Sequence, residues 1–315
     1  MTFVESEAAP APQPKAPPRT VKGKLAAGRF IVSVEIDPPR TLAMRRTLET
    51  AAHMKELGAD CINVGDSPMA ETRMSAIAVG ALMKQAGIEP IVHVSTRDRN
   101  LMALQSDLLG AHAWGLRNFL CIKGDNHALG AYGDKVKPVW NINALDLMRL
   151  LKGFNAGHDA IDKPVGTGAR FHVGAALNPC AADLEAEVKL ARNKIRAGAD
   201  FFLTQAVFDA ATIERVLELL GPSHPPIIMG VWPLHSERQC DFLEENHISS
   251  IPPHVRAAIE GAGGGAEQQG LELAQKLVES VRHLVQGVYF VPSFGRTTGI
   301  GELVVAARRL ADGVA

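Results

Sequence analysis

Apolar runs alternate with amphipathic stretches along the chain after residue 28. The apolar runs show little polar alternation, which is typical of parallel strands covered by helices. Eight of them are predicted strands, at 30–36, 60–65, 90–95, 117–122, 169–176, 200–206, 226–231 and 287–291. Helical spacing predicts a helix after each strand, at 43–57, 69–87, 100–113, 143–153, 181–197, 210–220, 267–284 and 298–311.

Eight strands, each followed by a helix, is the count of a (β/α)8 TIM barrel. We therefore predict a single α/β domain of this class over residues 23–315. Residues 57–60 and 197–200 share the pattern Gly-Ala-Asp, in which a glycine ends a helix and a strand follows at once. A doubly wound open sheet is the rival architecture, but no G-x-G-x-x-G motif follows the first predicted strand.

Four segments depart from a minimal barrel. Residues 1–22 are rich in Pro and Ala and are predicted to be a disordered tail. Residues 154–168 are a polar stretch before the fifth strand, and residues 245–266 carry Pro252-Pro253 and a flexible glycine-rich run from Gly261 to Gly265. Loops that follow barrel strands lie on the face where barrel enzymes bind substrates, so the Gly/Lys/Asn-rich segment 124–142 is a candidate binding loop.

Composition narrows the class of protein. Hydrophobic residues make up 46% of the chain, which is enough for a large buried core, and the net charge of −1 gives no electrostatic footprint for nucleic acid or membrane. No apolar run is long enough for a transmembrane helix. The four cysteines are scattered singly, which favours free thiols in a reducing cytoplasm over a disulfide framework or a zinc site.

The first predicted strand carries a carboxylate at the point where the strand must end. Proline cannot donate a hydrogen bond to a sheet, so Pro38 and Pro39 force the chain out of the sheet just after Glu35. Poor solvation at the end of an apolar strand raises a carboxyl pKa and suits it to general-acid catalysis. On position alone, an exposed acid in a turn is the simpler interpretation.

Polar residues stand at the ends of the other predicted strands as well. They are Asn63 with Asp66, His93 with Ser95, Lys123-Gly124-Asp125, Ala176 with Asn178, Gln205, Trp232 and Arg296. In a barrel these side chains converge on one site, and this mixture suits a heterocyclic substrate. Glu35, His93 and Asp125 lack the spacing of a metal-ligand motif, so no metal site is predicted.

Seven segments, taken in order, resemble one enzyme family. They are VSVEIDPPR, IVHVSTRDRN, FLCIKGD, FHVGAALNP, AGADFFLTQAVFD, PIIMGVWPL and GVYFVPSFGR. The family is methylenetetrahydrofolate reductase, and the chain looks closest to the bacterial variant found fused to homocysteine methyltransferase domains. The resemblance covers about residues 22–312. Its most specific parts are Glu-x-x-Pro-Pro, the Gly-Asp after the fourth strand and the Thr-Gln after the sixth.

The resemblance implies a reaction and a set of roles. The reaction is reduction of 5,10-methylenetetrahydrofolate to 5-methyltetrahydrofolate with NADH or NADPH, through FAD. Glu35 matches the acid that protonates the bridging folate nitrogen, and Asp125 matches a carboxylate beside flavin and pterin. Gln205 and Arg296 match substrate-binding residues. The positions that match flavin contacts are His93, Lys123, Gly124, Asp125, Ala176, Glu187 and Lys194.

The chain also departs from the family pattern around the flavin. Lys123 stands where an arginine is common, and Ala175-Ala176 replace an aromatic residue of the fifth strand. Three alternatives therefore stay open: a flavin-free homologue that takes hydride directly from the nicotinamide, an enzyme that oxidises methyltetrahydrofolate, and a folate-binding partner subunit with a weakened flavin site. The expected partner is a tetrahydrofolate derivative, with no nucleic acid or membrane. The sequence does not decide between a monomer and a homo-oligomer.

Overall fold

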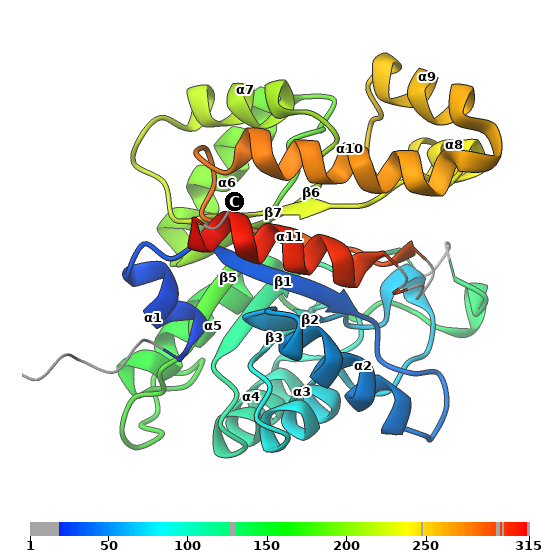
Figure 1. The fold of residues 1–315 in the computed structure, drawn as a ribbon. Helices are drawn as coiled ribbons and strands as arrows, with labels where there is room; N and C mark the ends of the chain where they lie inside the picture. The colour runs from blue at the N-terminus through cyan, green and yellow to red at the C-terminus, as the bar shows by residue number, and fades with distance from the viewer. Residues whose placement is uncertain (1–18, 127–129, 247, 294–296, 298, 314–315) are drawn as a thin grey trace, which may run out of the picture.

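Eight parallel strands form a closed barrel in a computed structural model that describes residues 19–126, 130–246, 248–293, 297 and 299–313 (Figure 1). Each strand pairs with the next along the chain, and the last pairs with the first. The strands are β1 (Ile31–Ile36), β2 (Cys61–Val64), β3 (Pro90–Ser95), β4 (Asn118–Ile122), β5 (His172–Leu177), β6 (Phe201–Ala206), β7 (Ile227–Val231) and β8 (Gly287–Phe290).

Helices surround the barrel, and two of them, α8 and α9, stand out from the ring at the upper right of Figure 1. The helices are α1 (Val21–Ala26), α2 (Arg45–Glu56), α3 (Ala76–Gln85), α4 (Leu101–Ala113), α5 (Ala144–Ala156), α6 (Leu184–Ala197), α7 (Ala210–Leu220), α8 (Glu237–Glu245), α9 (Pro253–Ala262), α10 (Ala266–Val281) and α11 (Ile300–Asp312). Short 3-10 turns are η1 (Pro68–Ala70), η3 (Gly133–Lys135) and η4 (Gly263–Gly265).

The predicted TIM barrel is confirmed, and each of the eight strands lies within three residues of its predicted position. Among the described residues, no helix is both long and apolar enough to cross a membrane.

No helix is predicted at 245–266, but this segment contains α9. Its two prolines start the helix: Pro252 is the N-cap and Pro253 the first helical residue, where a missing N–H costs nothing. The glycine run at 263–265 forms η4, which leads directly into α10.

The single helix predicted at 69–87 is also wrong in its first third. The segment begins with η1, and the helix α3 starts only at Ala76, where Ser75 caps it by accepting a hydrogen bond from the Ala78 N–H. Ser67, Met69 and Ala70 all have positive φ angles, which a continuous helix excludes. A contact with the loop after β4, described below, holds this turn in place.

The barrel wall separates two apolar layers. Residues that face the helices form the large outer core, and residues that face the barrel axis form a smaller inner one. The inner layer comprises Ile31, Cys61, Ile91, Leu120, Phe201, Leu203, Ile228 and Tyr289. The helix α1 contributes Val21 and Leu25 to this inner layer, so it closes the amino-terminal end of the barrel. It begins two residues before the predicted start of the domain at 23; residues 1–18 lie outside the described residues.

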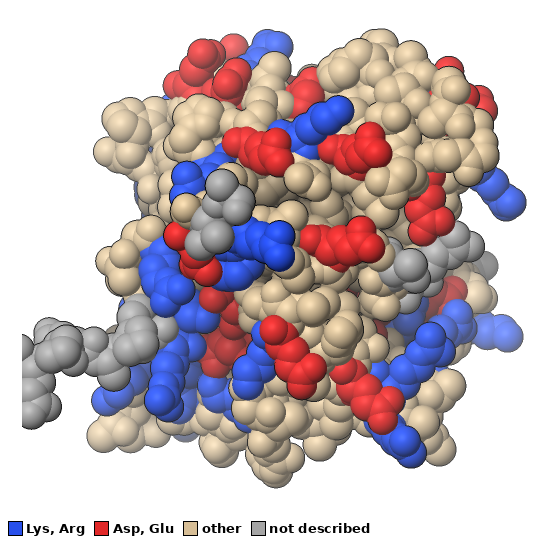
Figure 2. All heavy atoms as spheres, viewed as in Figure 1, with Lys and Arg blue, Asp and Glu red and all other residues tan. Residues whose placement is uncertain are grey.

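The two Gly-Ala-Asp joints fasten neighbouring strands by the same contact. Asp60 accepts a hydrogen bond from the Val32 N–H at 2.9 Å, and Asp200 accepts one from the Val173 N–H at 2.9 Å. Asp60 also pairs with Lys24 at 2.6 Å, which ties α1 to the barrel. Figure 2 shows lysines and arginines gathering around this amino-terminal end, which is consistent with cations at helix C-termini.

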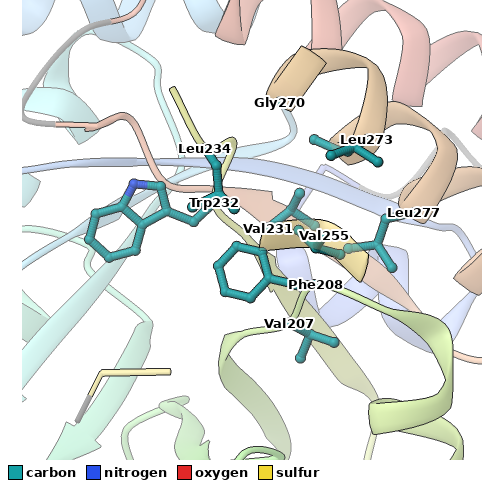
Figure 3. Close-up of a pocket in the computed structure, with 10 residues that line it drawn as sticks. Val207, Phe208, Val231, Trp232, Leu234, Val255, Gly270, Leu273 and Leu277 are labelled. Carbon is teal, nitrogen blue, oxygen red and sulfur yellow. The ribbon is translucent and has the colours of Figure 1, made fainter. Parts of the chain in front are cut away.

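A separate apolar cluster joins α8, α9 and the start of α10 to the carboxyl ends of β6 and β7. Figure 3 shows Phe208, Val231, Leu234, Val255 and Leu277 turned toward one another around an apolar pocket. Here α10 approaches the loop after β7 so closely that a Cβ at Gly270 would lie 1.6 Å from the Leu234 carbonyl oxygen. Only glycine fits there.

Candidate active site

The site lies at the carboxyl end of the barrel interior, one layer above the inner apolar core. Side chains alternate across a strand, so the residue two positions after an inner-layer residue faces the barrel axis again. Asn63 follows Cys61 and His93 follows Ile91 in this way, and Glu35 follows Ser33, which is the register partner of Cys61. In the β1–β2 register, Glu35 is the lateral partner of Asn63. The structure thus brings the predicted acid into a polar layer.

Glu35 has the electrostatic character expected of a general acid. Its side chain is half-buried, and burial, with a smaller contribution from Asp37, raises the pKa of Glu35 to about 8. Near neutral pH the carboxyl therefore keeps its proton. Asp37 in turn lies 3.6 Å from Arg73, whose Nη1 also donates to the Pro38 carbonyl at 3.3 Å. Arg73 fixes the turn that ends β1, a role that the sequence did not indicate.

Asn63, His93 and Ser95 are buried in the same part of the site. Among the described residues, both amide atoms of Asn63, Nε2 of His93 and Oγ of Ser95 find no hydrogen-bond partner. Burial lowers the pKa of His93 to about 4, so the imidazole is neutral near pH 7. Buried polar atoms are normally paired, and those that are not commonly mark a functional site or an unplaced ligand. Asn63 and Ser95 were noted as strand-end residues but given no role.

Asp66, which also follows β2, is fully engaged in structural contacts. It accepts a hydrogen bond from the Ser95 N–H at 2.8 Å, and it pairs with Arg99 at 2.7 Å. The Asp66 carboxylate therefore joins the ends of β2 and β3 and fixes the position of Ser95.

The Lys123-Gly124-Asp125 turn crosses the rim next to the end of β3. Gly124 has φ +86°, and a Cβ there would lie 2.8 Å from Cβ of Arg97, so both conformation and space require glycine. Asp125 is exposed, and its Oδ2 accepts a hydrogen bond from the Met69 N–H at 2.7 Å. This is the contact that holds η1. Arg97 is almost fully buried beneath the turn and donates to the carbonyls of Ser67 and Asp125.

Lys123 is exposed and lies over an aromatic ring from its own loop. Its Nζ is 4.8 Å from the ring centroid of Trp140, and the Trp140 Nε1–H donates to the Lys123 carbonyl at 3.2 Å. The predicted binding loop therefore folds back on the rim and presents an aromatic ring and a cation together. Trp140 was not singled out from the sequence because the contact depends on the return of the loop.

Gln205 lies at a bulge in β6. Two residues of β6, Thr204 and Gln205, oppose one residue of β7, and bulges of this kind redirect side chains next to active sites. The bulge is held by Tyr289, whose hydroxyl donates to the Thr204 carbonyl at 2.5 Å, and by the Gly230 N–H, which donates to Thr204 Oγ at 2.9 Å. The Gln205 side chain is exposed.

Tyr289 is a buried neighbour of the acid that the sequence did not reveal. Burial, and to a smaller extent the charge of Glu35, raise the pKa of Tyr289 well above its ordinary value. Every second residue of a barrel strand faces the axis, so neighbouring residues such as Tyr289 and Phe290 face opposite sides of the wall. This alternation was the signal in the sequence that could have placed Tyr289 inside the barrel.

Glu187 and Lys194 lie on α6, behind the end of β5. Lys194 is buried, donates to the Ala176 carbonyl at 2.7 Å and lies 3.3 Å from Glu187. Glu187 also accepts a hydrogen bond from the Asn178 N–H at 3.1 Å. Burial lowers the pKa of Lys194, opposed by Glu187. These two side chains thus join α6 to β5, and Ala176 is half-buried beside them.

Two further predictions concern the substrate-binding residue Arg296 and the absence of a metal site. Arg296 lies outside the described residues. Within the described part of the chain, no three side chains of the types His, Cys, Asp or Glu gather as a ligand set for a metal ion.

The model of the methylenetetrahydrofolate reductase family matches residues 20–294, which is most of the chain and the whole of the strand order described above. The chain belongs to the methylenetetrahydrofolate reductase family.

Curated members of this family are distant relatives. The chain is 24% identical over 264 residues to 5,10-methylenetetrahydrofolate reductase from Salmonella typhimurium, with 82% of each protein covered. It is 24% identical over 238 residues to a Caenorhabditis elegans protein named "Probable methylenetetrahydrofolate reductase (NADPH)". That match covers 72% of this chain but only 34% of the nematode protein, so the chain spans about a third of that relative.

Solved structures with this fold share little sequence with the chain. An uncharacterised protein from Clostridium thermocellum, which binds two copies of 5-methyl-5,6,7,8-tetrahydrofolic acid, superimposes with a TM-score of 0.65 at 15% identity. The match covers 93% of this chain and 99% of that one. A 2,3-dimethylmalate lyase gives a TM-score of 0.50 at 12% identity, with 93% and 87% covered. At such identities the likeness is one of fold.

Proposed function

We propose that this member of the methylenetetrahydrofolate reductase family reduces 5,10-methylenetetrahydrofolate to 5-methyltetrahydrofolate with NADH or NADPH. The observation that carries the proposal is Glu35, a carboxyl at the mouth of the barrel whose pKa is raised to about 8. A proton held near neutral pH is what the first step needs. Glu35 donates it to a bridging nitrogen of the folate, the five-membered ring opens to an iminium, and hydride then reduces the exocyclic carbon.

The substrate is held by the rim. We propose that Asp125 and Gln205, which are exposed at the ends of β4 and β6, bind polar edges of the pterin, and that Arg296 binds the glutamyl carboxylates. Guanidinium groups pair well with carboxylates, which supports the last role. Binding of 5-methyltetrahydrofolate by the structurally similar protein from Clostridium thermocellum also supports a folate site on this fold.

The family implies FAD, and the residues at the ring end of its site fit a flavin. Nε2 of neutral His93 and Oγ of Ser95 are buried and have no hydrogen-bond partner among the described residues. FAD, when bound, carries hydride between the nicotinamide and the folate. The residues that would hold it are His93, Lys123, Gly124, Asp125, Ala176 and Glu187, with Lys194 placed for a phosphate.

One observation favours a second candidate, a flavin-free reductase that takes hydride directly from the nicotinamide. Lys194, the proposed phosphate contact, is already engaged with Glu187 and the Ala176 carbonyl. A diphosphate would have to displace these contacts. Glu35 has the same role in both candidates and also in the reverse oxidation, because the same acid serves a reaction in both directions.

The test is to purify the protein, record its visible spectrum, and assay methylenetetrahydrofolate reduction with NADH and NADPH before and after adding FAD. Reduction with a flavin spectrum supports the FAD enzyme. Reduction by flavin-stripped protein, unchanged by added FAD, supports direct transfer. Folate binding without reduction in either direction would reject the reductase in favour of a folate-binding subunit.

Three finer assignments belong to the same proposal. On the seven segments quoted above, we propose that the chain is nearest to the bacterial variant found fused to homocysteine methyltransferase domains. The singly placed cysteines support a reducing, cytoplasmic location. A homo-oligomer remains a proposal to be tested by light scattering of the purified protein.

A further inference from the structure

Among the described residues, Asn63 is a buried amide with no hydrogen-bond partner, whereas the buried amides of Asn118 and Gln239 are hydrogen-bonded. Its side chain is completely inaccessible, and neither Nδ2 nor Oδ1 meets a partner among the described residues. Leaving both ends of an amide unpaired in the interior is costly, so a purely structural asparagine at this position would be selected against on stability alone.

The neighbour of this amide is the carboxyl of Glu35. The two residues are lateral partners in the β1–β2 register, and both face the barrel axis. Adjacent parallel strands lie about 4.8 Å apart, so a turn of the Asn63 side chain brings its amide to the carboxyl. No hydrogen bond to a side chain contributes to the pKa of Glu35, which is set by burial and Asp37.

We propose that Asn63 is the positioning residue of Glu35 and hydrogen-bonds its carboxyl in both protonation states. A carboxylic acid donates one hydrogen bond, whereas a carboxylate only accepts, and a carboxamide offers an acceptor and a donor on one planar group. Oδ1 accepts from the protonated acid. After the Glu35 O–H bond breaks and the proton moves to the folate nitrogen, the electron pair stays on the carboxylate, and the Nδ2–H donates to it.

Other groups near Glu35 are unsuited to this role. Asp37 is a carboxyl and is paired with Arg73, and the Tyr289 hydroxyl already donates to the Thr204 carbonyl. His93 is neutral near pH 7 and lies on β3, one strand beyond Asn63. Asn63 is the polar residue on the adjacent strand β2 whose Nδ2–H groups have no acceptor among the described residues.

Asn118 provides a matched control at the opposite end of the same barrel. It is also a buried asparagine on a barrel strand, but its Nδ2 donates to Glu89 at 2.9 Å and to the Pro90 carbonyl at 3.1 Å, and its Oδ1 lies 3.3 Å from His172 Nδ1. The variants Asn63→Leu and Asn118→Leu remove the same polar atoms and keep the number of side-chain heavy atoms. One removes an unpaired amide and the other a paired one.

The experiment is a carboxyl 13C NMR titration of the ligand-free protein labelled at glutamate, with Glu35 assigned by its loss in Glu35→Gln. A hydrogen bond to a charged group is stronger than one to a neutral group, so Asn63 lowers the Glu35 midpoint. We expect Asn63→Leu to raise that midpoint by about one to two pH units. We expect Asn118→Leu to leave it unchanged and to lower the melting temperature more than Asn63→Leu does.

An unchanged Glu35 midpoint in Asn63→Leu would overturn the inference. A melting temperature as low as that of Asn118→Leu would then show that Asn63 is a structural asparagine. Asn63→Ala, which adds no bulk, gives the same comparison if the leucine variant does not fold. The inference deepens the proposed function, in which Glu35 is the proton donor. Because the titration needs no substrate, its outcome is distinct from failure of the reductase assay.

Discussion

The raised pKa of Glu35 comes mainly from its burial at the end of β1 and only to a smaller extent from a neighbouring charge. The apolar strand β1 buries it, two prolines end the strand beyond it, and the nearby Asp37 carboxylate further disfavours its ionised form. Its pKa therefore lies well above the ordinary value of 4.5. The prolines and Asp37 lie beside Glu35 in the sequence, whereas its burial depends on closure of the barrel.

The pH dependence of the reaction should follow this carboxyl. Only the protonated form is active as an acid, so we expect kcat/KM for methylenetetrahydrofolate to fall about tenfold per pH unit above the Glu35 midpoint, which lies between the ordinary 4.5 and the value of about 8 that burial and Asp37 set. Asp37→Asn removes a neighbouring negative charge and should move the midpoint to lower pH. A profile whose basic limb starts near 4.5, the ordinary value for glutamate, would contradict this assignment.

The same shift has a consequence for stability. Between the unfolded pKa near 4.5 and the folded value of about 8, the native protein holds a proton that the unfolded chain has lost. Glu35 therefore makes the protein less stable as pH rises through this window. Glu35→Gln, which cannot ionise, should weaken that decline, as urea unfolding at pH 5 and pH 8 would measure.

Gln205 should affect substrate use and not stability. Its side chain is exposed at the β6 bulge, so Gln205→Ala should leave the melting temperature within error. A pterin group left without its partner costs about 1–3 kcal/mol, which predicts a loss of roughly 5- to 150-fold in kcat/KM. Gln275→Ala is the control, at a glutamine on α10 in the outer ring of helices (Figure 1), and it should change neither the melting temperature nor kcat/KM. Equal kinetics in the two variants would remove Gln205 from the site.

The residue contacts that the sequence did not reveal are long-range ones. Tyr289 reaches the Thr204 carbonyl across 85 positions, and Asp125 holds the Met69 N–H across 56. No local pattern marks such pairs, because they exist only once the barrel closes. The strand-end acid and glycine were predictable because their signals are contained in a few neighbouring residues.

At the scale of elements, the strands were predictable and several helices were not. Long apolar runs bounded by glycine or proline determine a buried strand locally. The helix α9 was missed because prolines and glycines usually break helices, yet Pro253 starts this one. The helix α8 was missed as well. The helix α1 was missed because its six residues are too few for a helical period, and its stability comes from packing into the barrel.

The packing of α1 can be tested at Leu25. Its side chain is buried against the inner layer at the amino end of the barrel, whereas Leu42 in the loop after β1 is fully exposed. We expect Leu25→Ala to lower the free energy of unfolding by roughly 2–5 kcal/mol and Leu42→Ala to leave it unchanged. Denaturant titration measures both. Equal midpoints for the two variants would show that α1 does not contribute to the core.

At the scale of the whole molecule, the closed barrel brings together side chains that are far apart in the sequence. The ends of eight strands meet at one mouth, so an acid from β1, an amide from β2, an imidazole from β3 and a glutamine from β6 share one region. The amino-terminal end is devoted to stability, with α1 and the two aspartate joints. In barrel enzymes the catalytic residues lie at the carboxyl ends of the strands, which is where the proposed site lies here.

The most direct test of this account is the rate of methylenetetrahydrofolate reduction by Glu35→Gln beside the wild type. Glutamine has nearly the same shape but no proton to donate, so we expect folate binding to persist and turnover to fall by about a hundredfold or more. Glu49→Gln, at an exposed glutamate of α2, should keep full activity. Near-wild-type turnover in Glu35→Gln would contradict the account.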